Sequence, residues 1–357
     1  MVGFLDGMRV LDLSAWRPMP HATQILADLG AEVLKVEPPG GDPMRSYPEI
    51  FASVARGKRS IVLDLRSEPG LAQALELAAE ADVVCEGWRP GVAQRLGIDY
   101  ESVAARNPAV IYCSLSGFGQ NGPLRDTPGH DVNFQALAGA VAQRSSVDGP
   151  PRVPRLPAAD LEGGTVCALL VCAAWARKLV SGEGEQIDVA MADVVAWWVG
   201  PRAHTVHDEP GRAERRGESP GYGVFETRDG AWIAIGVLAE QRLWDAVCRA
   251  LQLDDLLGMT FPERLDRASE VNKAIADAVS ELDATVALER FGVEGAPATA
   301  VLDPADAAVH PQFLARGLQV PTSAGVVPRV PAVFGGDFDA PAKIPAVGEH
   351  PEGFTPR

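Results

Sequence analysis

The first third of the chain alternates short, strongly apolar runs with segments of helical spacing, and this alternation is the feature that most constrains the fold. Segments of helical spacing occupy residues 21–31 and 71–81. Short, continuous apolar runs separated by helices are typical of a parallel sheet that is covered on both faces. The sequence therefore predicts an α/β fold. The apolar runs lie at residues 8–14, 31–37, 60–65, 82–86 and 109–117.

The turn after the first predicted strand argues against a dinucleotide-binding site. It reads SAWRPMPHA, with prolines where a G-x-G-x-x-G loop requires glycines. Those glycines allow the backbone to approach a pyrophosphate closely. A nicotinamide-dependent enzyme is therefore disfavoured.

The rest of the chain indicates a second unit. A long helix is predicted over 160–181, with Asp160 at its N-terminal edge, and a polar, broken stretch follows at about 200–222. A hairpin with an Asp229-Gly230 turn and several helical segments come next. After about residue 318, recurring proline and glycine predict an extended tail that returns to another part of the protein. A length of 357 residues is sufficient for two cores.

Charge and cysteine usage limit the class of partner. The formal net charge of −16 disfavours nucleic acid and anionic lipid, so a phosphate-bearing ligand would need a local basic patch. The five cysteines lie mostly in apolar runs without a C-x-x-C pair, which predicts reduced, buried thiols and a cytoplasmic location. No run approaches 18 apolar residues, so no membrane span is predicted.

A histidine and an aspartate stand side by side in PGHDVNFQALAG at 128–139. In one interpretation Asp131 caps a helix that begins near Val132. In the other, His130 handles protons, because its side chain titrates near neutral pH and lies at the positive end of that helix. The local sequence leaves both interpretations open.

Six segments in this order resemble the class III CoA transferases of the CaiB/BaiF type, and most of all the α-methylacyl-CoA racemases. The resemblance implies a Rossmann-like large domain with a parallel sheet, a smaller α+β domain and an interlocked homodimer. It places the large domain at 1–190, a linker at 191–222, the small domain at 223–318 and the C-terminal return at 319–357. The segments are LADLGAEVLKVEPPGGDPMR, RGKRSIVLDL, SGFGQNGP, PGHDVNF, AADLEGG and GEGEQIDVAMADV.

The resemblance also implies the chemistry. In a racemase of 2-methylacyl-CoA thioesters, His130 and Asp160 are the two bases that exchange the C2 proton, and Asp131 helps to orient the site. In a CoA transferase, Asp160 is instead the nucleophile that becomes an aspartyl-CoA thioester. Tyrosine is commoner than histidine at position 130 of the transferases, which favours the racemase. A third alternative is an acyl-CoA-binding protein with little catalysis.

The coenzyme A thioester is the expected substrate, with no further cofactor, and no histidine set has metal-ligand spacing, so no metal is predicted. Basic residues clustered near residue 56 suggest phosphate binding, although solvated surface charge is an equally good interpretation. The family resemblance places residues 62–65 at the adenosine and the turn near residue 130 at the thioester. The expected CoA-binding residues are Arg45, Arg56, Lys58, Arg59, Val62, Leu63, Asp64, Leu65, Arg89, Gly129, Val132, Asn133 and Phe134.

Three departures from the racemase pattern bear on this site. Pro38 replaces an arginine, and Ala239 replaces the glutamate that bonds the catalytic histidine. Glu240, one position further on, is then the possible histidine partner. Trp16 and Met19 replace small glycines, which predicts an acyl pocket of different shape.

Overall fold

The computed structural model describes residues 3–141, 153–207, 219–332, 334–335 and 340–356. The chain divides into two compact units. Unit 1 comprises Met1–Ala142, Arg152–Gly200 and Pro311–Arg357, and unit 2 comprises Gln143–Pro151 and Pro201–His310. Each unit is described by itself below.

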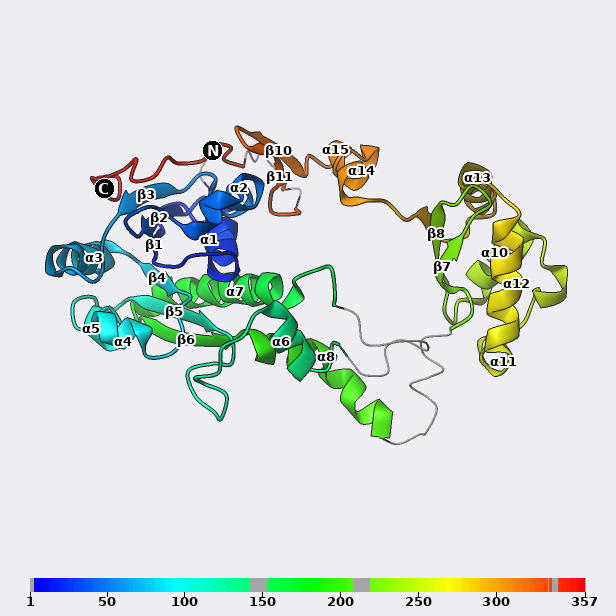
Figure 1. Ribbon diagram of the computed structural model, residues 1–357, viewed down its shortest axis with the longest axis horizontal. Helices are drawn as coiled ribbons and strands as arrows, with labels where there is room; N and C mark the ends of the chain where they lie inside the picture. The colour runs from blue at the N-terminus through cyan, green and yellow to red at the C-terminus, as the bar shows by residue number, and fades with distance from the viewer. Residues whose placement is uncertain (1–2, 142–152, 208–218, 333, 336–339, 357) are drawn as a thin grey trace. The chain divides into compact units, whose positions relative to one another are not determined.

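Unit 1 is built on a six-stranded sheet in which all the pairings are parallel (Figure 1). The strand order is β3-β2-β1-β4-β5-β6. The order reverses between β1 and β4, and this is where parallel sheets of this type open a crevice at the carboxyl ends of their strands. The predicted α/β parallel sheet is confirmed. The strands are β1 Arg9–Asp12, β2 Glu32–Glu37, β3 Arg59–Val62, β4 Val83–Glu86, β5 Ile111–Ser116 and β6 Glu185–Ala190.

Helices cover both faces of this sheet because successive strand side chains point to opposite sides. Val10 packs into an apolar cluster with residues of α1 and α7, whereas Leu11 packs into a second cluster with α3 and α5. Both side chains are fully buried. The helices of this part of the chain are α1 Pro18–Asp28, η1 Pro43–Ser46, α2 Pro48–Ala55, α3 Glu68–Glu80, α4 Val92–Leu96, α5 Tyr100–Ala104, α6 Asp131–Leu137, α7 Ala158–Ser181 and α8 Met191–His207.

Two glycines allow close packing of helix α7, Gly164 against α1 and Gly163 against the start of α8. A Cβ atom on Gly164 would lie 2.5 Å from the carbonyl oxygen of Pro18, and one on Gly163 would lie 3.0 Å from Met191. Among the described residues, α7 is the one helix with the length and apolar composition of a membrane span. One side of α7 packs against α1, α6 and strands β5 and β6, whereas apolar side chains on other sides, such as Leu169 and Leu179, are exposed.

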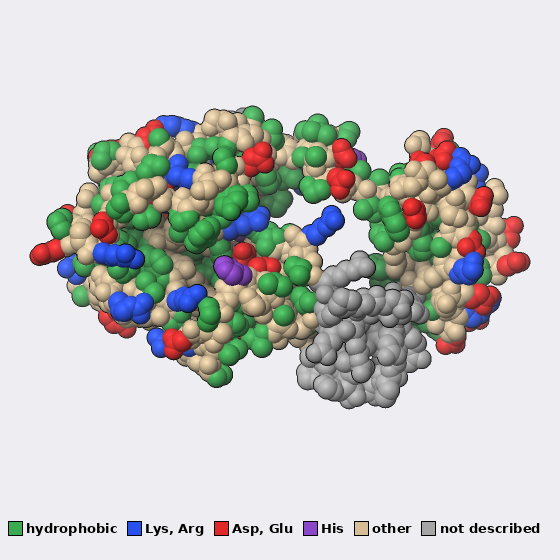
Figure 2. Space-filling view, in the orientation of Figure 1, with side chains coloured by type: hydrophobic (Ala, Val, Ile, Leu, Met, Phe, Trp, Pro, Cys, Tyr) green, Lys and Arg blue, Asp and Glu red, His purple; other side chains and the backbone are tan. Residues whose placement is uncertain are grey.

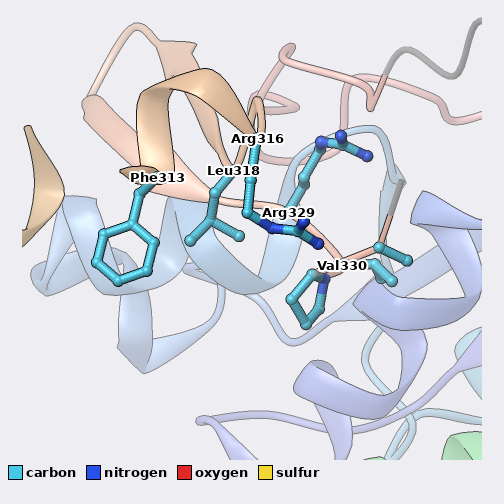
Figure 3. Close-up of a pocket in the computed structure, with 7 residues that line it drawn as sticks. Phe313, Arg316, Leu318, Arg329 and Val330 are labelled. Carbon is cyan, nitrogen blue, oxygen red and sulfur yellow. The ribbon is translucent and has the colours of Figure 1, made fainter. Parts of the chain in front are cut away.

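The C-terminal segment adds a hairpin and an extended return to unit 1. Helix α15 Pro311–Ala315 precedes the antiparallel strands β10 Gln319–Thr322 and β11 Gly325–Pro328. A small cavity here is lined by Phe313, Leu318, Arg316 and Arg329, and Figure 3 shows Leu318 between the Phe313 ring and the two arginines. The extended chain beyond this hairpin then runs along the sheet edge formed by β3.

Unit 2 contains a three-stranded antiparallel sheet packed on helices around the buried Trp244. The predicted hairpin is present, and Gly230 at its turn has a φ of +75°, a conformation that glycine adopts without strain. The elements are β7 Tyr222–Glu226, β8 Trp232–Gly236, α10 Gln241–Leu251, η2 Asp254–Leu256, α11 Phe261–Asp266, α12 Ala268–Ser280, α13 Ala284–Glu294, β9 Ala298–Ala300 and α14 Pro304–Ala308.

Several element boundaries differ from those expected. Residues 191–207, part of the predicted linker, form helix α8, and residues 208–218 lie outside the described residues. Residues 311–318, expected in the small domain, belong to unit 1. Helix α7 begins at Ala158, so Asp160 is its third residue, inside the first turn.

Candidate active site

A cavity of about 490 Å³ opens at the point where the strand order reverses. Three of its walls are the segments that directly follow β1, β4 and β5, because the carboxyl ends of parallel strands meet at one edge of a sheet. Figure 2 shows that on this face of unit 1 a histidine lies beside acidic side chains in the region of α6 and α7. The lining residues used below are Trp16, Arg17, Arg89, Phe118, Arg125, Gly129, His130, Phe134, Asp160 and Met191.

Asp160 enters this cavity from the first turn of α7. Its pKa is raised to about 6, first by burial and then by the nearby Asp131 carboxylate, while Arg17 and His130 act in the opposite direction. Burial disfavours the ionised form of a carboxyl group. Asp160 can therefore be protonated or ionised near neutral pH.

His130 lies across the same cavity, at the residue that precedes helix α6. Its backbone N–H donates to Asn133 Oδ1 over 3.0 Å, which fixes the first turn of that helix. The imidazole itself is exposed at the cavity. The structure thus brings together His130 and Asp160, which are 30 positions apart in the sequence.

Asp131 does not cap the helix from outside, because it is the first residue of α6 and His130 occupies the cap position. One carboxylate oxygen accepts a hydrogen bond from the Asp160 backbone N–H (3.2 Å) and the other accepts one from Gln135 Nε2 (2.5 Å). Asp131 therefore ties the start of α6 to the start of α7. It positions Asp160 and contributes the charge that raises the Asp160 pKa.

Phe134 holds the His130 turn against the sheet. Its buried ring lies between two glycine backbones, so that a Cβ atom on Gly117 or Gly129 would come within 2.6 Å of a ring carbon. The ring also meets Phe118 edge-on, at 5.1 Å between centroids. Phe134, expected among the CoA contacts, has a packing function here, whereas Val132 and Asn133 do not line the cavity.

Two of the basic residues expected to bind phosphate are buried and have partners inside the protein. Arg56 pairs with Asp28, and its Nη atoms also donate to the carbonyl oxygens of Pro328 and Pro341. Lys58 donates to Asp12, 3.0 Å away, and to Thr23. Neither side chain lines the cavity, and their buried ion pairs do not favour phosphate binding, which stays a prediction for both. A buried charge is stable only with such partners, and the sequence does not reveal burial.

The other two residues of this basic cluster anchor the C-terminal segment. Arg45 pairs with the buried Glu37 and donates to the carbonyl oxygen of Pro345, 3.1 Å away. Arg59 pairs with Glu352 and donates to the carbonyl oxygen of Gly353 over 2.8 Å. Both side chains are partly exposed, and their hydrogen bonds and ion pairs named here are with the protein itself. This function was missed because the tail is distant in sequence.

The segment expected at the adenosine lies outside the cavity lining, at the carboxyl end of β3. Val62 is the last residue of β3, and the backbone of Gly348 covers it closely. Leu63 is buried in the core, Asp64 is exposed and Leu65 is partly buried.

Among the remaining residues that were expected to bind CoA or to shape the acyl pocket, some line the cavity and one lies in the apolar core. Arg89 lines the cavity, and so does Trp16, which adopts a left-handed φ of +67°. Met19 is buried in the core, so it does not shape the acyl pocket as expected. Sequence reasoning missed two lining cations, Arg17 and Arg125, although Arg17 stands in the quoted SAWRPMPHA turn directly after the first strand.

Glu240, the possible partner of His130, belongs to unit 2. It precedes helix α10, and its carboxylate accepts a hydrogen bond from the Leu238 backbone N–H over 3.0 Å. Its pKa is lowered by backbone hydrogen bonds of this local turn. The partnership with His130 stays a prediction. Over the described parts of the chain, no group of three or more metal-ligating side chains is present.

A parallel α/β sheet with a carboxylate and an imidazole in one cavity at its reversal point defines an enzyme site. The chain matches CoA-transferase family III over residues 5–351, and it belongs to this family. It is 34% identical to the acetyl-CoA:oxalate CoA-transferase of Acetobacter aceti, over 96% of this chain and 92% of that protein. It is 31% identical to the α-methylacyl-CoA racemase of Mus musculus, over 97% of this chain and 91% of that protein.

A solved structure supports the same conclusion. The crystal structure of a CAIB/BAIF family protein from Brucella suis aligns with a TM-score of 0.87 at 28% identity, over 99% of this chain and 98% of that chain. The protein is thus an enzyme of a family that acts on acyl-CoA thioesters. The racemase assignment made from the sequence is not specifically supported, because transferases and a racemase match at similar identity.

Proposed function

We propose that this protein is a CoA transferase that moves coenzyme A from an acyl-CoA to a free carboxylic acid, with Asp160 as the nucleophile. The observation that carries this proposal is the Asp160 carboxyl group, which is held in the cavity by Asp131. With a pKa of about 6, most of it is ionised at pH 7 and able to attack. The identity to the oxalate transferase favours the same activity.

The proposed reaction needs no group beyond the two substrates. An Asp160 oxygen attacks the thioester carbonyl, and the C–S bond breaks to give a mixed anhydride and the CoA thiolate. The thiolate then attacks the aspartyl carbonyl, which releases the first acid as a carboxylate and leaves an aspartyl-CoA thioester. The acceptor carboxylate repeats both steps in reverse order, forming the new acyl-CoA and free Asp160.

CoA itself is proposed to lie along the cavity past Arg89 and Arg125. Both arginines line the cavity, and Arg89 follows β4 at the same edge of the sheet. In a chain of net charge −16, cations at the cavity supply the local positive field that a phosphate-bearing ligand requires. Val62 to Leu65 remain the proposed adenosine contact, at the neighbouring edge of the sheet.

The proposed assembly is a homodimer, as in the interlocked arrangement that the family resemblance implies. Large apolar side chains are exposed on α7 and α8, among them Leu169, Leu179, Trp197 and Trp198. An exposed apolar surface of this kind on a globular unit marks an interaction site. The five free thiols are compatible with a cytoplasmic location.

Racemisation at C2 remains the second candidate because His130 and Asp160 line one cavity. The Asp131 carboxylate accepts hydrogen bonds from the Asp160 backbone N–H and from Gln135 Nε2, and no hydrogen bond from it to the imidazole is found among the described residues. A two-base racemase needs a carboxylate that orients its histidine, and Glu240 remains the proposed partner.

The variant His130→Ala separates the two functions, and Asp160→Ala serves as the inactive control. In His130→Ala, a transferase keeps its transfer rate within about tenfold, whereas a two-base racemase loses deuterium exchange at C2 by about 10²-fold or more. Asp160→Ala abolishes either activity. Hydroxylamine trapping of an acyl or CoA adduct at Asp160 supports the transferase. Exchange of the C2 proton in D₂O without any CoA transfer would instead establish the racemase.

A further inference from the structure

Glu86 is a buried carboxyl group near the main cavity that the proposed transfer reaction does not use. It is the last residue of β4, and only 3% of its surface is exposed. Burial raises its pKa to about 7, and the Asp188 carboxylate acts in the same direction, while hydrogen bonds from Ser114 and from the Trp88 backbone N–H oppose the shift. Burying a carboxyl group is costly, so such a group in a native structure needs an explanation.

The carboxyl group of Glu86 holds the loop that carries Arg89. One of its oxygens accepts a hydrogen bond from the Trp88 backbone N–H over 2.7 Å. Trp88 directly precedes Arg89, and the loop 87–91 then leads into helix α4. A hydrogen bond to an ionised acceptor is about twice as strong as one between neutral groups. The bond therefore ties the backbone next to Arg89 to the end of β4.

A second carboxylate in the same row holds the loop that carries Arg125. Glu86 is paired with Ser114 across β4 and β5, and Ser114 is paired with Asp188 across β5 and β6. Asp188 accepts a hydrogen bond from the Gln120 backbone N–H over 3.0 Å. The carboxyl ends of these strands thus present two carboxyl groups, and each of them binds the backbone of one loop that carries an arginine of the cavity.

A second, smaller cavity lies at these two loops. It has a volume of about 140 Å³, and Glu86 lines it together with Arg89 and Arg125, both of which also line the main cavity. The two loops lie close together, because a Cβ atom on Gly91 would be 3.8 Å from Arg125 Nη2. Since the arginines are shared by the two cavities, a change at Glu86 can reach the main cavity through them.

We infer that Glu86 is a positioning residue for coenzyme A binding, which holds the Arg89 loop so that the guanidinium group is presented to the CoA phosphates. This inference rests on the proposed placement of CoA past Arg89. Glu86 itself does not touch the substrate. A loop that is held in place before the ligand arrives lowers the entropic cost of binding. Removing Glu86 therefore weakens CoA binding only while Arg89 is present, and it leaves the chemistry at Asp160 unaltered.

The inference is tested by a double-mutant cycle on the Kd of coenzyme A, which is not turned over without an acyl donor. Arg89→Gln removes a charge-assisted contact to a phosphate, and we expect the Kd to rise about 10- to 100-fold. Glu86→Ala should raise the Kd about 5- to 20-fold in the wild type but less than about twofold in the Arg89→Gln background. Glu86→Gln, whose amide oxygen can accept the Trp88 N–H, should stay within about threefold of the wild type.

Steady-state kinetics and a control variant separate positioning from a purely structural function. In Glu86→Ala the KM for the acyl-CoA should rise with the Kd, while kcat stays within about threefold of the wild type. Asp99→Ala is the matched control, because Asp99 lines the same small cavity but accepts the Ser102 backbone N–H of α5 over 3.3 Å. Its Kd for CoA should not change. Glu86→Asp, one methylene shorter, takes the place of the alanine variant if that variant unfolds.

Independent losses in the two single variants that add in the double variant would overturn the inference, and so would a loss of kcat at unchanged KM. If Glu86→Ala binds CoA like the wild type while Arg89→Gln does not, the CoA placement stands and the function of Glu86 is refuted. A wild-type Kd in Arg89→Gln refutes the placement and the inference together. The expected coupling in a protein that transfers CoA to no acid refutes the transferase and leaves the inference standing.

Discussion

The substitution Asp160→Asn separates the chemistry of the carboxyl group from its effect on folding. In the folded protein its pKa rises from 3.8 to about 6, chiefly because the group is buried and secondly because Asp131 is near. The native state thus holds the proton more tightly than the unfolded state. Stability falls as the pH rises from about 4 to about 6, and the full penalty is present above that range.

The size of this stability penalty follows from the shift of the Asp160 pKa. At 1.36 kcal/mol per pKa unit, the change corresponds to about 3 kcal/mol. Asp160 is only partly buried and lines an open cavity, so solvent screening reduces this to about 1–2 kcal/mol. Asparagine has nearly the same shape and carries no charge. At pH 8 the variant is therefore expected to melt about 1–4 °C above the wild type. Near pH 5 about half of that difference remains.

The measurements are thermal unfolding at pH 8 and pH 5 together with a transfer assay. Activity should fall by on the order of 10³ or more, because the amide cannot act as the nucleophile. Asp193→Asn, an exposed aspartate on α8, gives the background effect of removing one negative charge. A Tm difference that is identical at both pH values, or a wild type that is the more stable at pH 8, would refute the argument from burial.

Four further outcomes are expected. The wild-type kcat/KM should rise with pH through about 6 and then level, because only ionised Asp160 attacks; a flat profile from pH 5 to 8 contradicts this. Gly129→Ala should lower the free energy of unfolding by about 1–3 kcal/mol and remove most of the activity, since its Cβ would meet the Phe134 ring at 2.6 Å. Gly236→Ala, which has open space around it, is the control and should change neither property. Gly164→Ala should disturb the contact of α7 with α1 and raise KM; unchanged kinetics would show that α7 tolerates the shift. Lys58→Met should lower the free energy of unfolding by about 3–5 kcal/mol, because the buried Asp12 loses its ion pair. A purified variant that unfolds like the wild type but binds CoA poorly would instead support the phosphate interpretation.

Much of the sheet could be predicted from the sequence because its strands are buried on both faces. Strand β5 is buried along its whole length and consists of Ile, Tyr, Cys and Leu with two small serines, so its apolar run is visible without an alignment. The cavity's two reactive side chains were also visible, since His130 follows a Pro-Gly break and Asp160 begins a long apolar helix. The exact ends of helices were predicted less reliably. His130, and not Asp131, occupies the cap position of α6, and α7 begins at Ala158 instead of residue 160.

What the sequence determined by itself was the class of fold, the family resemblance and the identity of the residues that could act as base or nucleophile. Only the tertiary structure decided what the charged residues do. Arg56 and Lys58 are buried with partners that lie far away in the sequence, whereas Arg17 and Arg89 line the cavity. The free energy of a charge depends on its burial and its neighbours, and both are set by long-range contacts that a linear pattern does not contain.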